Sequence, residues 1–170
     1  MDYQEYKRDF LEGLRNDSAI SGADTEDEFL NHTLGILADF DEVNDPMRIG
    51  MGDKRGKGNR LMRVDGYCFD ETDHSLVMFI SDFQDSFDPD TLTMTRVDEL
   101  YWRLYYFLDE VCNGNINDYF DDSDDILKIA RVIRKRMNAV GNDPDMILKI
   151  KFYILTNKEL STDLLNKNLL

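Results

Sequence analysis

The stretch from Arg63 to Phe83, RVDGYCFDETDHSLVMFISDF, constrains the fold more than any other part of the sequence. It reads as two strands joined by a short acidic turn within ETDH. The second strand contains the uninterrupted apolar run from Leu76 to Ile80, which is typical of a strand buried on both faces. A strand of this kind needs helices on both sides of its sheet.

Helical spacing of apolar residues recurs in four segments, about 1–22, 25–40, 95–111 and 124–140. In the second segment Thr25 and Glu28 fit the S/T-x-x-E capping box, and in the third Thr95 is the expected cap. The apolar segment MILKIKFYILT then predicts a buried strand.

A hairpin, a helical crossover and a further strand predict an α/β fold, with a mixed sheet made of the hairpin plus the crossover strand and flanked by helices. The 170 residues suit one domain over 1–170, with a peripheral helix at about 1–22. No clear element is predicted for the final stretch NKELSTDLLNKNLL, and we expect the chain to be the amino-terminal part of a longer protein.

The acidic balance limits the classes of partner. A net charge of −15 argues against tight, sequence-independent nucleic-acid binding, which depends on Lys and Arg. The charge nevertheless comes in blocks, because residues 48–63 hold six basic residues and only one acidic residue, Asp53. Nucleic acid therefore stays open as a partner, although solvated faces are the favoured interpretation of such blocks.

The glycine-rich loop GMGDKRGKGNR lies inside this basic block and lacks the order of a nucleotide-binding P-loop. A linker is favoured there over a phosphate cradle. Cys68 and Cys112 lie in apolar stretches, which indicates a reducing, cytoplasmic setting. No apolar run approaches the ~20 residues of a membrane span, so no membrane partner is expected.

The two strands of the hairpin each carry an aspartate, Asp65 and Asp82. A turn centred between Thr72 and Asp73 places Asp65 opposite Ile80, and the alternation of side chains then predicts Asp82 on the same face. Two carboxylates so placed can share Mg²⁺, which prefers carboxylate oxygens and retains water.

Glu28, on a helix expected to pack nearby, is the candidate third ligand of that site. Each acid also has a structural interpretation. Glu28 fits the capping box, Asp65 before Gly66 fits a bulge, and Asp82 fits the start of the next turn.

Three segments of the chain resemble a known family in their motifs, order and spacing. They are VDGYCFDETDHSLVMFISDF, TLTMTRVDELYWRLYYFL and ILKIKFYILTNKELS, and the chain from about Glu28 to about Ser161 resembles the amino-terminal domain of the abortive infection phage resistance (AIPR) family. The resemblance implies a bacterial phage-defence protein, usually longer than this chain, whose amino-terminal part is similar to the restriction-endonuclease fold.

Nuclease members of that fold carry an Asp on one strand, then an acidic residue or Gln, one spacer and a Lys on the next. Asp65 matches the first position, whereas Ile80 and Asp82 stand at the acidic and lysine positions. That lysine orients the attacking water and stabilises negative charge on the phosphate, whereas Asp82 is itself negatively charged. The positive charge is therefore missing unless Arg63 or Lys151 extends into this position.

The resulting prediction is a phage-defence domain with a nuclease-like scaffold that serves sensing, binding or assembly, with no committed catalytic residue or cofactor. The alternative is a divergent Mg-dependent nuclease that uses Asp65 and Asp82, with Glu28 as a further metal ligand. The rest of a longer chain and a second copy are the other candidate partners. An aromatic stripe offers an interface, although stripes at helical spacing are more often core; its members are Tyr101, Trp102, Tyr105 and Tyr106.

Overall fold

The computed structural model describes residues 2–167. Its helices are α1 (Tyr3–Ser21), α2 (Thr25–Asp39), α3 (Met94–Asn113), α4 (Asp125–Met137) and α5 (Thr162–Lys167), with short 3-10 turns η1 (Lys57–Asn59) and η2 (Ile116–Asp118). Its strands are β1 (Met47–Arg48), β2 (Lys54–Arg55), β3 (Leu61–Met62), β4 (Gly66–Asp70), β5 (Ser75–Asp82), β6 (Thr91–Leu92), β7 (Lys149–Thr156) and β8 (Glu159–Leu160). None of the helices within residues 2–167 combines the length and apolar character that crossing a membrane requires.

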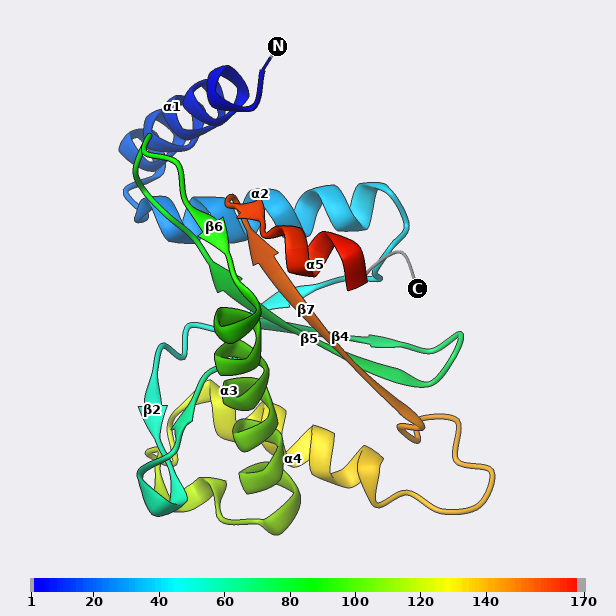
Figure 1. Ribbon diagram of the computed structural model, residues 1–170. Helices are drawn as coiled ribbons and strands as arrows, with labels where there is room; N and C mark the ends of the chain where they lie inside the picture. The colour runs from blue at the N-terminus through cyan, green and yellow to red at the C-terminus, as the bar shows by residue number, and fades with distance from the viewer. Residues whose placement is uncertain (1, 168–170) are drawn as a thin grey trace.

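The main sheet has four strands in the order β1-β4-β5-β7. β4 runs antiparallel to both β1 and β5, whereas β7 runs parallel to β5. Between β5 and β7 the chain passes through α3 and α4, so the sheet combines a hairpin with a crossover strand (Figure 1). The predicted α/β class with a mixed, helix-flanked sheet is confirmed.

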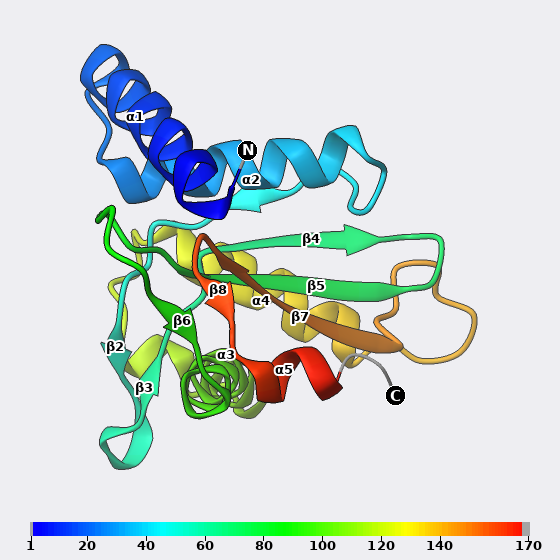
Figure 2. The ribbon, with the colours of Figure 1, turned by 45° about the horizontal axis from the view of Figure 1, so that its top comes forward.

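The sheet separates two apolar cores. On one face, Val77 and Phe79 of β5 pack with α1 and α2, and on the other face Leu76, Met78 and Ile80 pack with α3 and α4 (Figure 2). All residues of β5 are buried, as the apolar run predicts. Because apolar side chains on both faces of one strand leave water together, β5 anchors both halves of the molecule.

The hairpin contains a one-residue slip at Asp65. Its register runs from Asp70 opposite Ser75 to Gly66 opposite Phe79, which centres the turn between residues 72 and 73. The Asp65 amide, however, also donates to the Phe79 carbonyl, at 2.8 Å. Two consecutive residues therefore face Phe79, which is the geometry of a β-bulge.

Gly66 is the second residue of this bulge, and β1 passes close beside it. A Cβ at Gly66 would lie 3.0 Å from the Met47 carbonyl oxygen, closer than ordinary packing allows. A glycine at this position thus lets the backbones of β1 and β4 approach each other.

Both expected helix caps are off by a residue or two. The N-cap of α2 is Asp24, whose carboxylate accepts from the Asp27 amide at 2.7 Å, so Thr25 is already helical. The N-cap of α3 is Thr93, whose hydroxyl accepts from the Arg96 amide, rather than Thr95. In each case a neighbouring side chain of equal capping ability takes the position.

Three further expectations need correction. The glycine-rich loop is not a linker, because it folds into the antiparallel β2–β3 hairpin, in which Met62 is buried. Strand β7 lies at the edge of the sheet and is mostly half-buried, with only Leu155 fully buried. The final stretch does hold elements within the described residues, namely β8 and α5.

Candidate functional site

Asp65 is the centre of a buried polar cluster on the α2 side of the sheet. The residue is only 5% exposed. Its Oδ1 accepts from Arg63 Nε at 2.7 Å, and its Oδ2 accepts from the Ser81 amide at 2.7 Å. Both oxygens of the carboxylate are therefore engaged by donors from the two strands of the hairpin region.

Glu26, in the first turn of α2, joins the cluster from above the sheet. Its Oε1 lies 2.8 Å from Arg63 Nη2, so that one guanidinium bridges Glu26 and Asp65. The Ser81 hydroxyl lies between the two acids, 2.9 Å from Glu26 Oε1 and 3.1 Å from Asp65 Oδ2, and it has one proton to give.

The electrostatics of the cluster favour a fixed charge on Arg63. Burial lowers the pKa of Arg63, but the hydrogen bonds and negative charges of Asp65 and Glu26 outweigh it and raise the pKa above its ordinary value. The guanidinium is therefore permanently charged, and it neutralises two carboxylates at once.

The cluster lines a pocket of about 270 Å³ between the start of α2 and the loop after β1. Arg48 stands in the wall of this pocket and forms a 2.6 Å ion pair with Asp27. The charged groups that line the pocket are therefore paired, positive with negative, and the pocket does not carry a predominant charge of one sign.

Asp82 belongs to a different cluster, on the α3 side of the sheet. It is 4% exposed. Its Oδ1 accepts from Arg96 Nε at 2.9 Å, and its Oδ2 forms a 2.9 Å ion pair with Lys158 Nζ. Lys158 also pairs with Asp90 at 2.9 Å, so the cluster joins β5, α3, the segment before β6 and the segment after β7.

The cations of the Asp82 cluster, like Arg63, have their charged forms favoured by the acids around them. Burial lowers the pKa of Lys158, but hydrogen bonds and charges of Asp82 and Asp90 outweigh it and raise the pKa above its usual range. The Arg96 pKa is raised too, since Glu99 and Asp82 outweigh the effect of burial.

The expectation that Asp65, Asp82 and Glu28 come together is wrong. The bulge at Asp65 moves its carboxylate to the face of Phe79 and Ser81, whereas Asp82 stays on the opposite face. Glu28 points elsewhere and accepts from the Ser21 hydroxyl. Within residues 2–167, no three His, Cys, Asp or Glu side chains gather in a group able to hold a metal ion.

Sequence reasoning missed Glu26 and Ser81 as members of the cluster. The sequence did contain a signal, because a glycine inside a strand, here Gly66, often marks a bulge. A bulge at this point places Asp65 on the same face as Ser81. Of the two cations considered as a substitute for the missing lysine, Arg63 reaches Asp65. Lys151 instead pairs with Asp73 at 2.8 Å, beside the turn of the hairpin.

Comparison with known protein families gives a match over most of the chain. Residues 29–169 match the abortive infection phage resistance protein N-terminal domain, a stretch that contains both aspartate clusters except Glu26. The chain belongs to this family. No curated protein and no solved structure gave a match. α1 precedes the matched residues of this AIPR domain and packs on α2, most of which lies within them.

The Asp65 cluster of the AIPR domain does not fit Mg²⁺ as it is arranged. Such an ion needs several oxygens that face one point, with room for water. Here Asp65 accepts from Arg63 and from the Ser81 amide, and the nearest second acid, Glu26, shares the same guanidinium. The residues present therefore do not fit a Mg²⁺ centre.

Proposed function

We propose that this AIPR domain acts in phage defence as a binding module on a restriction-endonuclease-like scaffold, without hydrolytic activity of its own. The observation that carries the proposal is the position of Arg63, whose guanidinium bridges Asp65 and Glu26. A hydrolytic site of this kind would need a divalent cation among these carboxylate oxygens.

The side chains opposite Asp65 support the same conclusion. After the bulge, the residues of β5 on its face are Phe79 and Ser81, each one position before Ile80 and Asp82, which the resemblance aligns with the acidic residue and the lysine. A phenyl ring cannot ligate a metal ion, and a hydroxyl carries no positive charge to stabilise a phosphoryl transition state. The neighbouring pair on the other face, Ile80 and Asp82, lacks the lysine as well.

Energetics also oppose an exchange of Arg63 for a metal ion. Taking Arg63 away would leave Asp65 buried without a cation, a situation that costs about 3–5 kcal/mol for a fully buried pair. A bound ion would have to supply that free energy as well as its own dehydration.

The proposal is tested with end-labelled DNA and RNA, single- and double-stranded, incubated with the purified protein and Mg²⁺ or Mn²⁺. We expect no cleavage products, and no heat of Mg²⁺ binding in calorimetry. Cleavage that is lost in Asp65→Asn and kept in the control Glu28→Gln would overturn the proposal, because Glu28 lies on the same helix as Glu26 but outside the cluster.

One observation favours the alternative, a divergent Mg-dependent nuclease. Two acids and an arginine, Glu26, Asp65 and Arg63, line the same pocket. In that alternative Glu26→Gln would abolish phage protection. Our proposal expects bacteria that express Glu26→Gln to show the same reduction in plaque number as those that express the unchanged protein.

A further inference from the structure

The outer face of α3 carries four aromatic side chains, three of which are exposed. Tyr101, Trp102 and Tyr105 are 42%, 46% and 40% exposed, whereas Tyr106 is half-buried and packs against the core. A core role is therefore wrong for the three exposed rings and right for Tyr106. The rings stack on one another, with Trp102 on Tyr106 at 5.6 Å between centroids and 25° between planes. We call these four residues the aromatic stripe.

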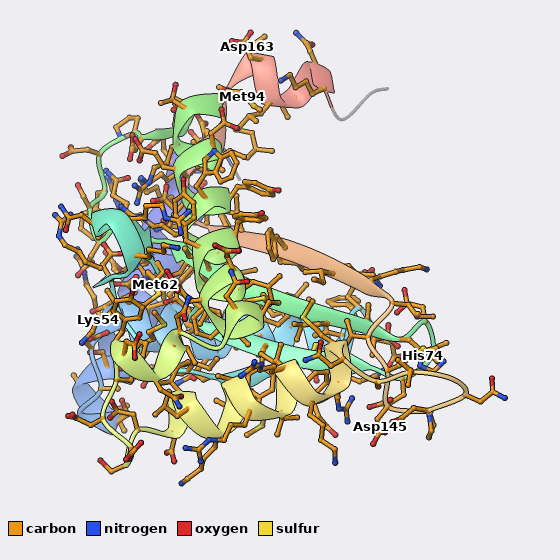
Figure 3. All side chains as sticks on the ribbon, turned by 90° about the horizontal axis from the view of Figure 1, so that it is seen from below. Lys54, Met62, His74, Met94, Asp145 and Asp163 are labelled. Carbon is orange, nitrogen blue, oxygen red and sulfur yellow. The ribbon has the colours of Figure 1, made fainter. Side chains whose placement is uncertain are left out.

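The β2–β3 hairpin stands beside the stripe and is basic. Arg55 and Lys57 are exposed, and neither forms an ion pair with any side chain in the part of the chain that the structure describes. Arg60 lies over the stripe itself, with its guanidinium carbon 4.4 Å from the centre of the Tyr106 ring. Figure 3 shows the hairpin, labelled at Lys54 and Met62, beside α3, labelled at Met94.

An open groove of about 500 Å³ separates the two. Its hairpin wall is formed by Arg55, Asn59 and Leu61, and its α3 wall by Glu99, Trp102, Arg103 and Tyr106. Three carboxylates in or beside it are already paired, Glu99 with Arg96, Asp53 with Arg103 and Asp109 with Arg60.

We infer that this groove binds single-stranded nucleic acid, with bases stacked on the aromatic stripe and phosphates held by the hairpin cations. Exposed aromatic faces beside unpaired cations are the combination by which proteins hold single strands without reading their sequence. A duplex keeps its base faces covered by its own stacking, so it cannot use the stripe in this way.

The cations are what favours a nucleic acid over a protein partner here. Tyr, Trp and Arg are also common at protein interfaces. Arg55 and Lys57, however, have side chains without an ion pair among the described residues of a chain of net charge −15, so they offer local complementarity to phosphate. The nearby Glu110 carboxylate accepts from the Lys57 backbone amide instead. Asp98, an exposed acid at the start of the stripe without an ion pair among residues 2–167, weakens that attraction. This inference goes beyond the proposed lack of hydrolysis and does not depend on it.

Trp102 is the only tryptophan of the chain, so its fluorescence reports on the stripe directly. The test titrates the protein at low salt with ten-nucleotide oligothymidylate and, separately, oligouridylate, which distinguishes DNA from RNA. We expect quenching of Trp102 with micromolar affinity. With about three phosphates neutralised, the logarithm of the affinity should fall with the logarithm of salt concentration with a slope of about −2.

Matched variants localise the binding, read by the anisotropy of a labelled oligonucleotide. We expect Trp102→Ala, and the double variant Arg55→Glu with Lys57→Glu, each to weaken binding by about tenfold or more, since one base stack is worth ~1–3 kcal/mol. Asp98→Asn should strengthen binding about twofold. The controls Tyr6→Ala and Arg131→Glu change an exposed aromatic on α1 and an exposed cation on α4, and should leave binding unchanged.

Binding that persists in the groove variants would overturn the inference. The absence of any binding at low salt and about 100 µM protein would overturn it too, because that concentration equals the weakest dissociation constant, about 100 µM, typical of non-specific nucleic-acid binding at physiological salt. A dimer in sedimentation that Trp102→Ala dissociates, without oligonucleotide binding, would assign the stripe to a second copy and overturn it too. None of these outcomes bears on hydrolysis, which the cleavage assay measures separately.

Discussion

Asp65 and Asp82 are equally buried acids at the same end of the β4–β5 hairpin, yet they are neutralised in different ways. Asp65 is held by Arg63, two residues away, and by Ser81 on the facing strand, beside a pocket. Asp82 is held by Arg96 and Lys158, which come from α3 and from the segment after β7.

The difference separates a local arrangement from a tertiary one. The partners of Asp82 are brought together only when the helical crossover has folded back, so this cluster fastens the crossover to β5. The Asp65 cluster needs only the hairpin and the start of α2, and it faces a space that solvent or a ligand can enter. We therefore regard the Asp82 cluster as structural and the Asp65 cluster as the candidate site.

The largest expected effect is that of Asp82→Asn. It leaves Arg96 and Lys158 without their buried counter-charge, and we expect a loss of about 3–5 kcal/mol in the free energy of unfolding. Urea denaturation followed by circular dichroism measures it. The control Asp90→Asn removes only the more exposed partner of Lys158 and should cost less than about 1 kcal/mol. A similar, small loss for Asp82→Asn would contradict the structural role of this cluster.

Arg63→Met should have a smaller effect, about 2–3 kcal/mol, because water from the pocket can reach Asp65 and the Ser81 amide still donates to it. The same denaturation experiment applies. Arg48→Met changes the other arginine of the pocket, whose pair with Asp27 is partly exposed, and should cost less than about 1 kcal/mol. A loss for Arg63→Met as large as that for Asp82→Asn would remove the distinction between the two clusters.

Alkaline pH should separate the clusters further. Because Asp82 and Asp90 raise the pKa of Lys158 above its ordinary value of 10.5, the stabilisation by this ammonium is complete below pH 10.5 and is lost as the pH rises through the raised value. Arg63 stays charged throughout that range. We expect Lys158→Arg to protect the protein as the pH rises above 10.5, measured as the free energy of unfolding of both proteins at each pH. Equal alkaline sensitivity of both proteins would show that Lys158 does not set it.

The smallest expected effect is that of Glu26→Gln, which should lower the free energy of unfolding by less than about 1 kcal/mol. The Glu26 side chain is half exposed, and the ion pair between Arg63 and Asp65 remains in the variant. Thermal unfolding of the variant beside Glu28→Gln, which lies on the same helix, gives the comparison. A loss above about 2 kcal/mol for Glu26→Gln alone would make Glu26 part of the fold rather than of the pocket.

The sheet could be predicted from the sequence because its signal is strong and local. The apolar run of β5 and the acidic turn before it define the hairpin and its centre, and the following helical segments define the crossover. Strand order is not local, and for that reason the edge position of β7 was missed.

The site was harder to predict because one residue decides it. Alternation along a strand predicts which face of the sheet a side chain lies on only while the register is regular. The bulge changes the register at Asp65 itself, so the predicted face of its carboxylate is wrong. Likewise Asp24 and Thr25 are both good caps, and the sequence does not say which of them starts α2.

The bulge also sets an evolutionary barrier. To build an acid and a lysine opposite Asp65, the chain would have to replace Phe79, which is completely buried in the α1–α2 core, together with Ser81. The other route is a deletion that restores the regular pleat and carries Asp65 across to the side of Asp82. Neither route is a single substitution, so we expect no single substitution to place an acid and a lysine opposite Asp65.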